Sequence, residues 1–286
     1  MPTPENPEAT SGLPASAPSS TPAAAEPPSA PKPGDSYVQS FARGLEVIRS
    51  FSASAPQQTL SEVAAQTGLT RAGARRILLT LQTLGYVETD GKLFRLSPRI
   101  LDLGFAYLSS LPMWNLAEPV MEDLVEQVRE SSSAAVLDGL DIVYVLRVPT
   151  HKIMRTSLGV GSRLPAAWTS MGRVLLASLP DDELQSRLAT LPLQRHTAHT
   201  ATDLPTLLER IRQARTQGWC LVNQELEEGL ISIAAPLTNR LGQTVAALNI
   251  SGQANRTSAE LMQQTLLPPL LRAAQTISRL MGAPRR

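Results

Sequence analysis

The segment that most constrains the fold of this chain runs from residue 60 to residue 96 and reads LSEVAAQTGLTRAGARRILLTLQTLGYVETDGKLFRL. Two short helical patterns begin it. The first is expected over Glu62–Thr67 behind Ser61 and the second behind Thr70, because Ser and Thr commonly cap helices. Gly68 lies between them, where glycine often takes the left-handed conformation that ends a helix. The two helices are therefore expected to meet at a tight turn.

A β-hairpin is predicted directly after the second helix. Beyond Gly85, apolar and polar residues alternate in YVET and KLFRL, which flank Asp90-Gly91, a pair typical of two-residue hairpin turns. Helix, turn, helix and hairpin follow one another here in the order of a winged helix.

The second helix divides into an apolar face and a basic face. Arginines on the basic face can reach base edges and phosphates when such a helix enters a major groove. Gly73 costs about 1 kcal/mol of helix stability relative to Ala, which we interpret as allowing the backbone to approach DNA. The apolar face is expected to consist of Ala74, Ile77, Leu78, Leu81 and Leu84. The DNA-contacting residues are expected to be Arg71, Ala72, Gly73, Arg75, Arg76, Lys92 in the hairpin and Arg43 upstream.

The charge distribution fits a polyanionic partner for this segment. Residues 36–99 hold eight Lys and Arg against four Asp and Glu, although the whole chain has a formal net charge of only +1. A three-helix bundle with a solvated basic face is the alternative. The two caps, the turn glycine and the hairpin together favour the winged helix.

The chain is expected to be α+β and to have four regions. Residues 1–35 hold ten of the 23 prolines and are predicted to be a disordered tail. Residues 36–97 form the winged helix-turn-helix domain, 98–111 a linker helix, and 112–283 an α/β domain with a largely antiparallel sheet. The first helix of the winged domain is expected to pack through residues at three-four spacing, namely Val38, Phe41, Leu45, Ile48 and Phe51.

Composition argues against several other classes of protein. Cys220 is the sole cysteine, so no disulfide can form within the chain and a reducing cytoplasm is favoured; we expect it to be a small core residue. No apolar run is long enough for a membrane helix, and the N-terminus has no signal-peptide pattern. His196 and His199 lack evident further metal ligands. No catalytic motif is present, so we expect neither an enzyme nor a cofactor.

The quoted segment, extended through SPRILDLG, resembles the winged helix of the isocitrate lyase regulator (IclR) family of bacterial transcription factors. VGSRLPAAWTSMGRVLLASL and GWCLVNQELEEGLISIAAPLTNRLGQTVAALNISG resemble its effector domain, so the resemblance covers residues 36–283. Gly218, Glu225 and Ser232 match the family pattern, whereas Val222 and Thr238 depart from it. These features are most similar to the branch that controls aromatic-acid catabolism by the β-ketoadipate route.

The resemblance implies a GAF-like effector domain with a pocket between a curved sheet and a loop with its following helix. A helix N-terminus at residues 169–172 offers backbone N–H groups to a carboxylate, and a guanidinium from Arg147 or Arg155 could bind it in bidentate fashion. The expected effector-binding residues are Thr169, Ser170, Met171, Gly172, Asn223, Glu225, Leu230, Ser232, Asn249, Ser251, Arg155 and Arg147.

The expected function is that of a ligand-responsive transcriptional regulator of aromatic-acid catabolic genes. Its partners would be double-stranded operator DNA, an aromatic or dicarboxylic acid, and further copies of the chain in a dimer or dimer of dimers. RNA polymerase would join them if the regulator activates. Two alternatives remain: an IclR-type repressor that responds to a small non-aromatic acid, and an enzyme with an appended helical bundle.

Overall fold

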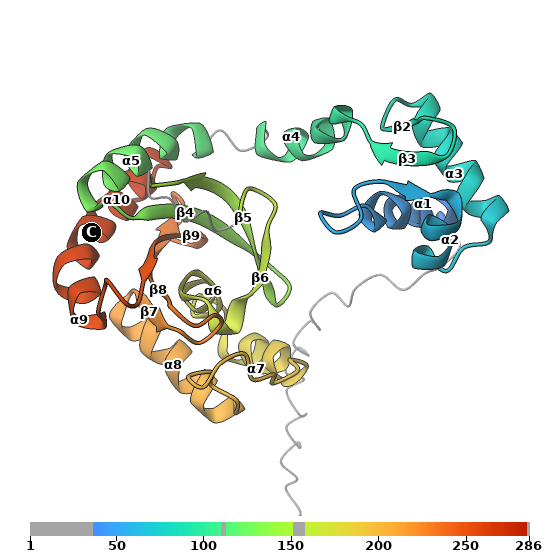
Figure 1. Cartoon of the computed structure of the whole chain (residues 1–286). Coiled ribbons are helices and arrows are strands. Elements are labelled where there is room, and N and C mark those ends of the chain that lie inside the picture. The colour runs from blue at the N-terminus through green and yellow to red at the C-terminus, as the bar shows by residue number, and fades with distance from the viewer. Residues whose placement is uncertain (1–36, 110–112, 151–157, 285–286) are drawn as a thin grey trace, which may run out of the picture. The chain divides into compact units, whose positions relative to one another are not determined.

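The computed structural model describes residues 37–109, 113–150 and 158–284 (Figure 1). The predicted tail at residues 1–35 and the expected effector-binding residue Arg155 lie outside these residues. The chain divides into two compact units, one ending at Arg99 and the other starting at Ile100.

The N-terminal unit consists of three helices and a small sheet. Its strands pair in the order β1-β3-β2, and both pairs are antiparallel. The elements are α1 (Gln39–Ser50), β1 (Gln58–Thr59), α2 (Leu60–Thr67), α3 (Arg71–Thr83), β2 (Val87–Thr89) and β3 (Leu93–Leu96).

The turn between α2 and α3 forms as its residues predict, but the cap of α2 does not. Gly68 ends α2 in the left-handed conformation with φ of 64°, and the Thr70 hydroxyl accepts the N–H of Gly73 at the start of α3. The cap of α2 is Thr59, not Ser61. Thr59 and Glu62 form a capping box, in which each side chain accepts the other residue's backbone N–H.

The core of this unit uses a different face of α1 from the one expected. Val47 is fully buried against Val63 and Leu78, whereas Val38 and Phe41 are 62% and 68% exposed. Leu45 is also exposed, so the predicted packing stripe of α1 is wrong at its first three positions. The apolar stripe is present, but its first three positions are exposed among the described residues of the unit.

The hairpin forms around Asp90-Gly91, as expected. The Asp90 carboxylate accepts the N–H groups of Lys92 and Leu93, and Gly91 has φ of 99°. These two bonds hold the pKa of Asp90 below its usual value.

A short 3-10 turn, Pro98–Ile100, leads into α4 (Leu101–Ser109), which corresponds to the expected linker helix. None of its side chains is buried, and Leu101 and Phe105 are 71% and 68% exposed.

The second unit is a curled, six-stranded antiparallel sheet in the order β6-β5-β4-β9-β8-β7. Its strands are β4 (Ser131–Asp138), β5 (Asp141–Val148), β6 (Arg163–Pro165), β7 (Cys220–Asn223), β8 (Leu230–Thr238) and β9 (Thr244–Gln253). Its helices are α5 (Met113–Val128), α6 (Ser170–Leu176), α7 (Asp181–Ala189), α8 (Leu204–Gln217), α9 (Ala259–Leu261) and α10 (Leu267–Leu280).

Helices cover both faces of this sheet (Figure 1). On the outer face α5 and α10 pack together over one apolar core, and on the inner face α6 lies within the curl of the sheet over a second core. The sequence did not predict α7 or strand β6, and a π-helical turn, Met262–Leu266, lies between α9 and α10. In the described segments, no helix is long and apolar enough to cross a membrane.

Candidate DNA interface and effector pocket

Helix α3 presents its arginines to solvent because its other face is packed. Ala74 and Leu78 are fully buried and Leu81 nearly so, which fixes the rotation of the helix. Two of the five expected core positions do not pack fully, since Ile77 is half-buried and Leu84 is 51% exposed. The exposed face carries Arg71, Ala72, Arg75 and Arg76.

A basic groove of about 460 Å³ lies between α3 and the hairpin. Arg71 and Arg75 line it from the helix and Lys92 from the hairpin, and among the described residues none that lines it is acidic. Three cations with no anion make a surface suited to phosphate. Arg76 and Arg43 are exposed but do not line this groove.

The structure gives a local reason for a glycine at position 73, which the sequence did not reveal. A Cβ at this position would lie 3.2 Å from Oγ1 of Thr70, the hydroxyl that caps α3. An alanine would therefore crowd the cap, which offsets part of its advantage in helix propensity.

The second candidate site is a pocket inside the curl of the sheet. It is bounded by β5, β6, β8, β9, the start of α6 and the turn between β7 and β8. The cavity volume is about 40 Å³, far below the roughly 300 Å³ of common ligand sites. An aromatic acid would therefore have to push the pocket walls apart on entry.

Nine of the twelve expected effector-binding residues line this pocket. Gly172 and Asn223 do not, and Arg155 lies outside the described residues. The nine that come together are Arg147, Thr169, Ser170, Met171, Glu225, Leu230, Ser232, Asn249 and Ser251.

The two residues that miss the pocket do so for geometric reasons. A Cβ at Gly172 would come within 2.1 Å of the carbonyl oxygen of Ala166, so this glycine serves the close packing of α6 on the preceding turn. Asn223 follows Val222 on β7, and because successive strand residues face opposite sides, only Val222 points into the pocket.

The N-terminus of α6 is less open to a carboxylate than its sequence suggests. Thr169 Oγ1 already accepts the N–H of Gly172 at 3.1 Å. Ser170 is buried, and its hydroxyl lies 2.8 Å from that of Ser232 across the pocket floor. The hydroxyls of Ser170 and Ser232 are thus polar groups of the pocket beside this helix start.

Arg147 is the cation placed to meet an acid in this pocket. Its Nη1 donates to Ser133 Oγ at 3.4 Å, and it forms no ion pair among the described residues. Tyr144 lines the same wall, and burial raises the pKa of its phenol. Asn249 Oδ1 accepts the N–H of Ser133 at 2.9 Å, which anchors the amide beside them. A guanidinium, a phenol and an amide therefore surround one small apolar space.

Glu225 lines the pocket but is already paired. Both of its oxygens bind the Arg173 guanidinium, at 2.7 and 2.6 Å, and Arg210 approaches within 2.7 Å. Direct binding of the effector by Glu225 stays a prediction, and the two arginines already engage both of its carboxylate oxygens.

The sequence missed several lining residues. One of them is Trp168, which is buried, with Nε1 donating to the carbonyl of Ala201 and its ring 4.9 Å from that of His196. The other missed residues are Tyr144, Leu158, Leu164, Val222, Leu226 and Glu227.

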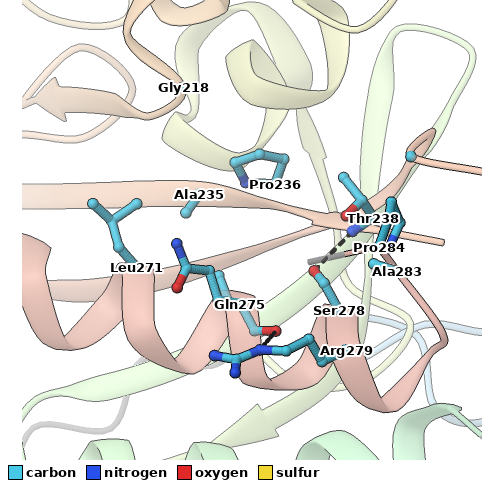
Figure 2. A pocket seen from close by; sticks show the side chains of 12 residues that line it. Gly218, Ala235, Pro236, Thr238, Leu271, Gln275, Ser278, Arg279, Ala283 and Pro284 are labelled. Atoms are coloured by element: carbon cyan, nitrogen blue, oxygen red, sulfur yellow. Dashed lines mark hydrogen bonds between the residues drawn. The ribbon is translucent and has the colours of Figure 1, made fainter. Parts of the chain in front are cut away.

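A larger, open groove of about 680 Å³ lies on the outer face, between α10 and β8 (Figure 2). Leu271 and Ala235 give it an apolar wall, and Ser278 Oγ accepts the N–H of Thr238 at 3.0 Å. Its cation, Arg279, is exposed. This groove lacks the enclosed polar groups of the inner pocket, so we take the inner pocket as the ligand site.

The described residues give no support for a metal site or a reactive thiol. The described residues include no group of three or more His, Cys, Asp and Glu placed to hold a metal ion. Cys220 is buried, as expected, and burial raises the pKa of its thiol to about 11.

A winged helix with a basic groove, joined to a sensor fold with an enclosed pocket, defines the class of ligand-responsive DNA-binding regulators. Residues 40–91 match the IclR helix-turn-helix domain, and residues 105–279 match the Bacterial transcriptional regulator IclR C-terminal family. The chain belongs to the IclR family of bacterial transcriptional regulators.

Individual relatives agree with this assignment. The chain is 41% identical over 242 residues to the Pca regulon regulatory protein of Pseudomonas putida, which covers 84% of this chain and 83% of that protein. A solved chain from Rhodococcus sp. RHA1 is 51% identical, with a TM-score of 0.78 over 86% of this chain and 98% of its own. An IclR homologue from Microbacterium hydrocarbonoxydans, solved with 4-hydroxybenzoate, is 26% identical, with a TM-score of 0.74 over 84% and 98% of the two chains.

These relatives place the chain among the IclR-type regulators of aromatic catabolism, as the sequence motifs indicated. They do not favour the alternative of a regulator that responds to a non-aromatic acid.

Proposed function

We propose that an aromatic carboxylic acid binds in the inner pocket of this regulator and changes its affinity for operator DNA upstream of aromatic-acid catabolic genes. The observation that carries this proposal is the Arg147 guanidinium, which lacks an ion pair among the described residues and lines a small pocket with Tyr144 and Trp168. A cation meets the carboxylate, and the rings and leucines meet the aromatic ring.

The polar groups of the pocket also suit a ring hydroxyl. Ser170, Ser232 and Asn249 come from three different elements and present hydroxyl and amide groups. Each can donate to or accept from a phenol. The likeness to a homologue solved with 4-hydroxybenzoate supports the same class of ligand.

The proposed DNA interface is the α3 face together with the hairpin, with Arg71, Arg75 and Lys92 at its centre. Arg76, Ala72 and Gly73 extend it along the helix, and Arg43 contributes from α1. In our proposal the regulator is a dimer that reads two half-sites, and it acts by binding rather than by catalysis.

The exposed apolar residues of α1 and α4 support the dimer. Phe41 on α1 with Val38 just before it, and Leu101 and Phe105 on α4, are each at least 62% exposed in a single chain. Exposed apolar side chains of this kind, within each unit taken by itself, commonly mark a protein interface. Contact with RNA polymerase would follow if the regulator activates.

Thermal unfolding of the full chain tests the ligand class. We expect 4-hydroxybenzoate to raise the midpoint, because a ligand at about 100 times its Kd stabilises the native state by roughly 2.7 kcal/mol. Adipate, a dicarboxylate without a ring, should have a much smaller effect. Equal shifts, or a shift with adipate alone, would contradict the proposed ligand class.

A further inference from the structure

Glu225 separates two cavities of the second unit. It lines the effector pocket on one side, and on the other a polar cleft of about 350 Å³ that Arg173 and Arg210 also line. Its side chain is only 6% exposed. An unscreened carboxylate at this place would repel an anionic ligand. The positive charges around Glu225 should therefore affect the affinity of the pocket for anions.

The two arginines that pair with Glu225 have different environments. Arg173, on α6, has a side chain 2% exposed, binds both carboxylate oxygens, and also donates from Nε to the carbonyl of Ala167 at 2.8 Å. Arg210, on α8, is 38% exposed and reaches one oxygen at 2.7 Å. Arg173 is therefore a structural partner of the buried carboxylate, whereas Arg210 adds a second positive charge from the surface.

The Glu225 cluster consequently carries an excess positive charge. Arg173 alone balances Glu225, and Arg210 leaves the three side chains with one net positive charge. Glu227, which also lines the pocket, is exposed, so solvent screens its charge. Among the described residues that line the pocket itself, Arg147 is the cation, whereas Arg173 and Arg210 line the cleft on the other side of Glu225.

We propose that Arg210, a residue outside the effector pocket, sets the preference of that pocket for an anionic over a neutral ligand. It acts through Glu225, whose second oxygen it holds. Glu225 is then a positioning residue, and Arg210 is an electrostatic specificity determinant. This inference rests on the proposed function, because it concerns the same ligand class and the same pocket.

The test compares an acid with its neutral isostere. Calorimetry on the full chain would measure Kd for 4-hydroxybenzoate and for 4-hydroxybenzamide, in wild type and in Arg210→Gln. We expect Arg210→Gln to weaken the acid by roughly tenfold while the amide changes by less than about threefold, since only the acid carries the charge that Arg210 attracts. Arg210→Lys, which keeps the charge, should retain the preference for the acid.

Arg215 provides a matched control on the same helix. Its side chain is also 38% exposed and ion-paired, but with Asp181. We expect Arg215→Gln to leave the ratio of the two Kd values unchanged. It removes the ion pair with the exposed Asp181 and two hydrogen bonds to the carbonyls of Ala177 and Leu179, so it controls for the general loss of an arginine from α8.

The measurements distinguish failure of the Arg210 inference from failure of the proposed ligand class. An unchanged Kd ratio in Arg210→Gln, or equal weakening of both ligands, would show that Arg210 has only a structural role and would overturn the inference. Absence of 4-hydroxybenzoate binding to the wild type would overturn the proposed ligand itself, and the inference with it.

Discussion

Tyr144 and Arg147 face the same cavity although they are three residues apart on one strand. Residues at this spacing normally point to opposite faces of a sheet. Ala135 pairs with Tyr144 while its neighbour Ala134 pairs with Leu146, so Val145 is the extra residue of a β-bulge. The bulge brings the phenol and the guanidinium into one pocket.

Replacing Arg147 tests the carboxylate contact. We expect Arg147→Gln to raise the Kd for 4-hydroxybenzoate about tenfold to a hundredfold, because a hydrogen bond between charged groups contributes roughly 1.5–3 kcal/mol. Calorimetry on the full chain measures this. Arg163→Gln, at an exposed arginine paired with Asp138 and Asp141, should bind normally. An unchanged Kd in Arg147→Gln would show that Arg147 does not bind the carboxylate of the ligand.

Replacing Arg75 tests the DNA interface. We expect Arg75→Ala to weaken operator binding by about 1–3 kcal/mol, with little change in the unfolding midpoint, because the side chain is exposed. Fluorescence anisotropy with labelled operator would measure the change. The control is Arg187→Ala on α7, which should bind DNA like the wild type. Wild-type affinity in Arg75→Ala would exclude this face of α3.

The capping box gives a stability prediction with a pH dependence. We expect Thr59→Ala to lower the free energy of unfolding by about 0.5–2 kcal/mol and Ser61→Ala to change it by less than about 0.5 kcal/mol. Urea denaturation measures both. A larger loss of unfolding free energy in Ser61→Ala than in Thr59→Ala would show that Ser61 is the cap of α2.

The pH dependence follows from Glu62. Hydrogen bonds from the backbone and then the hydroxyl of Thr59 lower the pKa of Glu62 in the folded state. Its contribution is therefore present above the unfolded pKa of about 4.3, and it is lost as pH falls through the lower folded value. The gap between wild type and Thr59→Ala should shrink over that range.

Cys220 should be unreactive in the folded protein. Burial raises the pKa of its thiol to about 11, and only the thiolate attacks disulfide reagents. At pH 8 we expect the thiol to react with Ellman's reagent only upon unfolding. Because the folded pKa is raised, the stabilisation is complete below the unfolded pKa of about 8.5 and is lost as pH rises towards 11. Rapid labelling of the native chain would contradict this.

Gly172→Ala should be among the most destabilising single substitutions in the second unit. The new methyl group would meet the backbone of Ala166 at 2.1 Å, and a backbone cannot move aside as a side chain can. We expect a loss of more than about 2 kcal/mol. Gly159→Ala is a control, since nothing lies within 4 Å of its added Cβ. Equal stability of the two variants would refute the packing role.

Local signals in the sequence predicted much of the fold. Gly68, Thr70 and Asp90-Gly91 act on backbone within three residues of themselves, and the structure confirms all three. The choice between Thr59 and Ser61 could not be made from residue type, because both side chains can cap a helix. Periodicity also identified an apolar stripe on α1 without showing that Val38, Phe41 and Leu45 are exposed among the described residues.

The pocket was less predictable for a different physical reason. Strand alternation assigns residues to faces, but the bulge at Val145 changes that assignment, and its position follows from pairing with β4 rather than from the residue itself. Glu225 was recognised as a pocket residue. Its pairing with Arg173 and Arg210, which are 52 and 15 positions away in sequence, could be seen only in three dimensions.

The exposed linker helix has a consequence for how a signal would reach DNA. α4 has nine residues and buries none of them, and isolated helices shorter than about 12 residues are marginal in water. Its stiffness should therefore depend on whatever covers Leu101 and Phe105. If a second copy of the chain packs on these side chains, dilution would dissociate the dimer and make α4 flexible. The monomer would then bind its ligand without a change in its affinity for DNA.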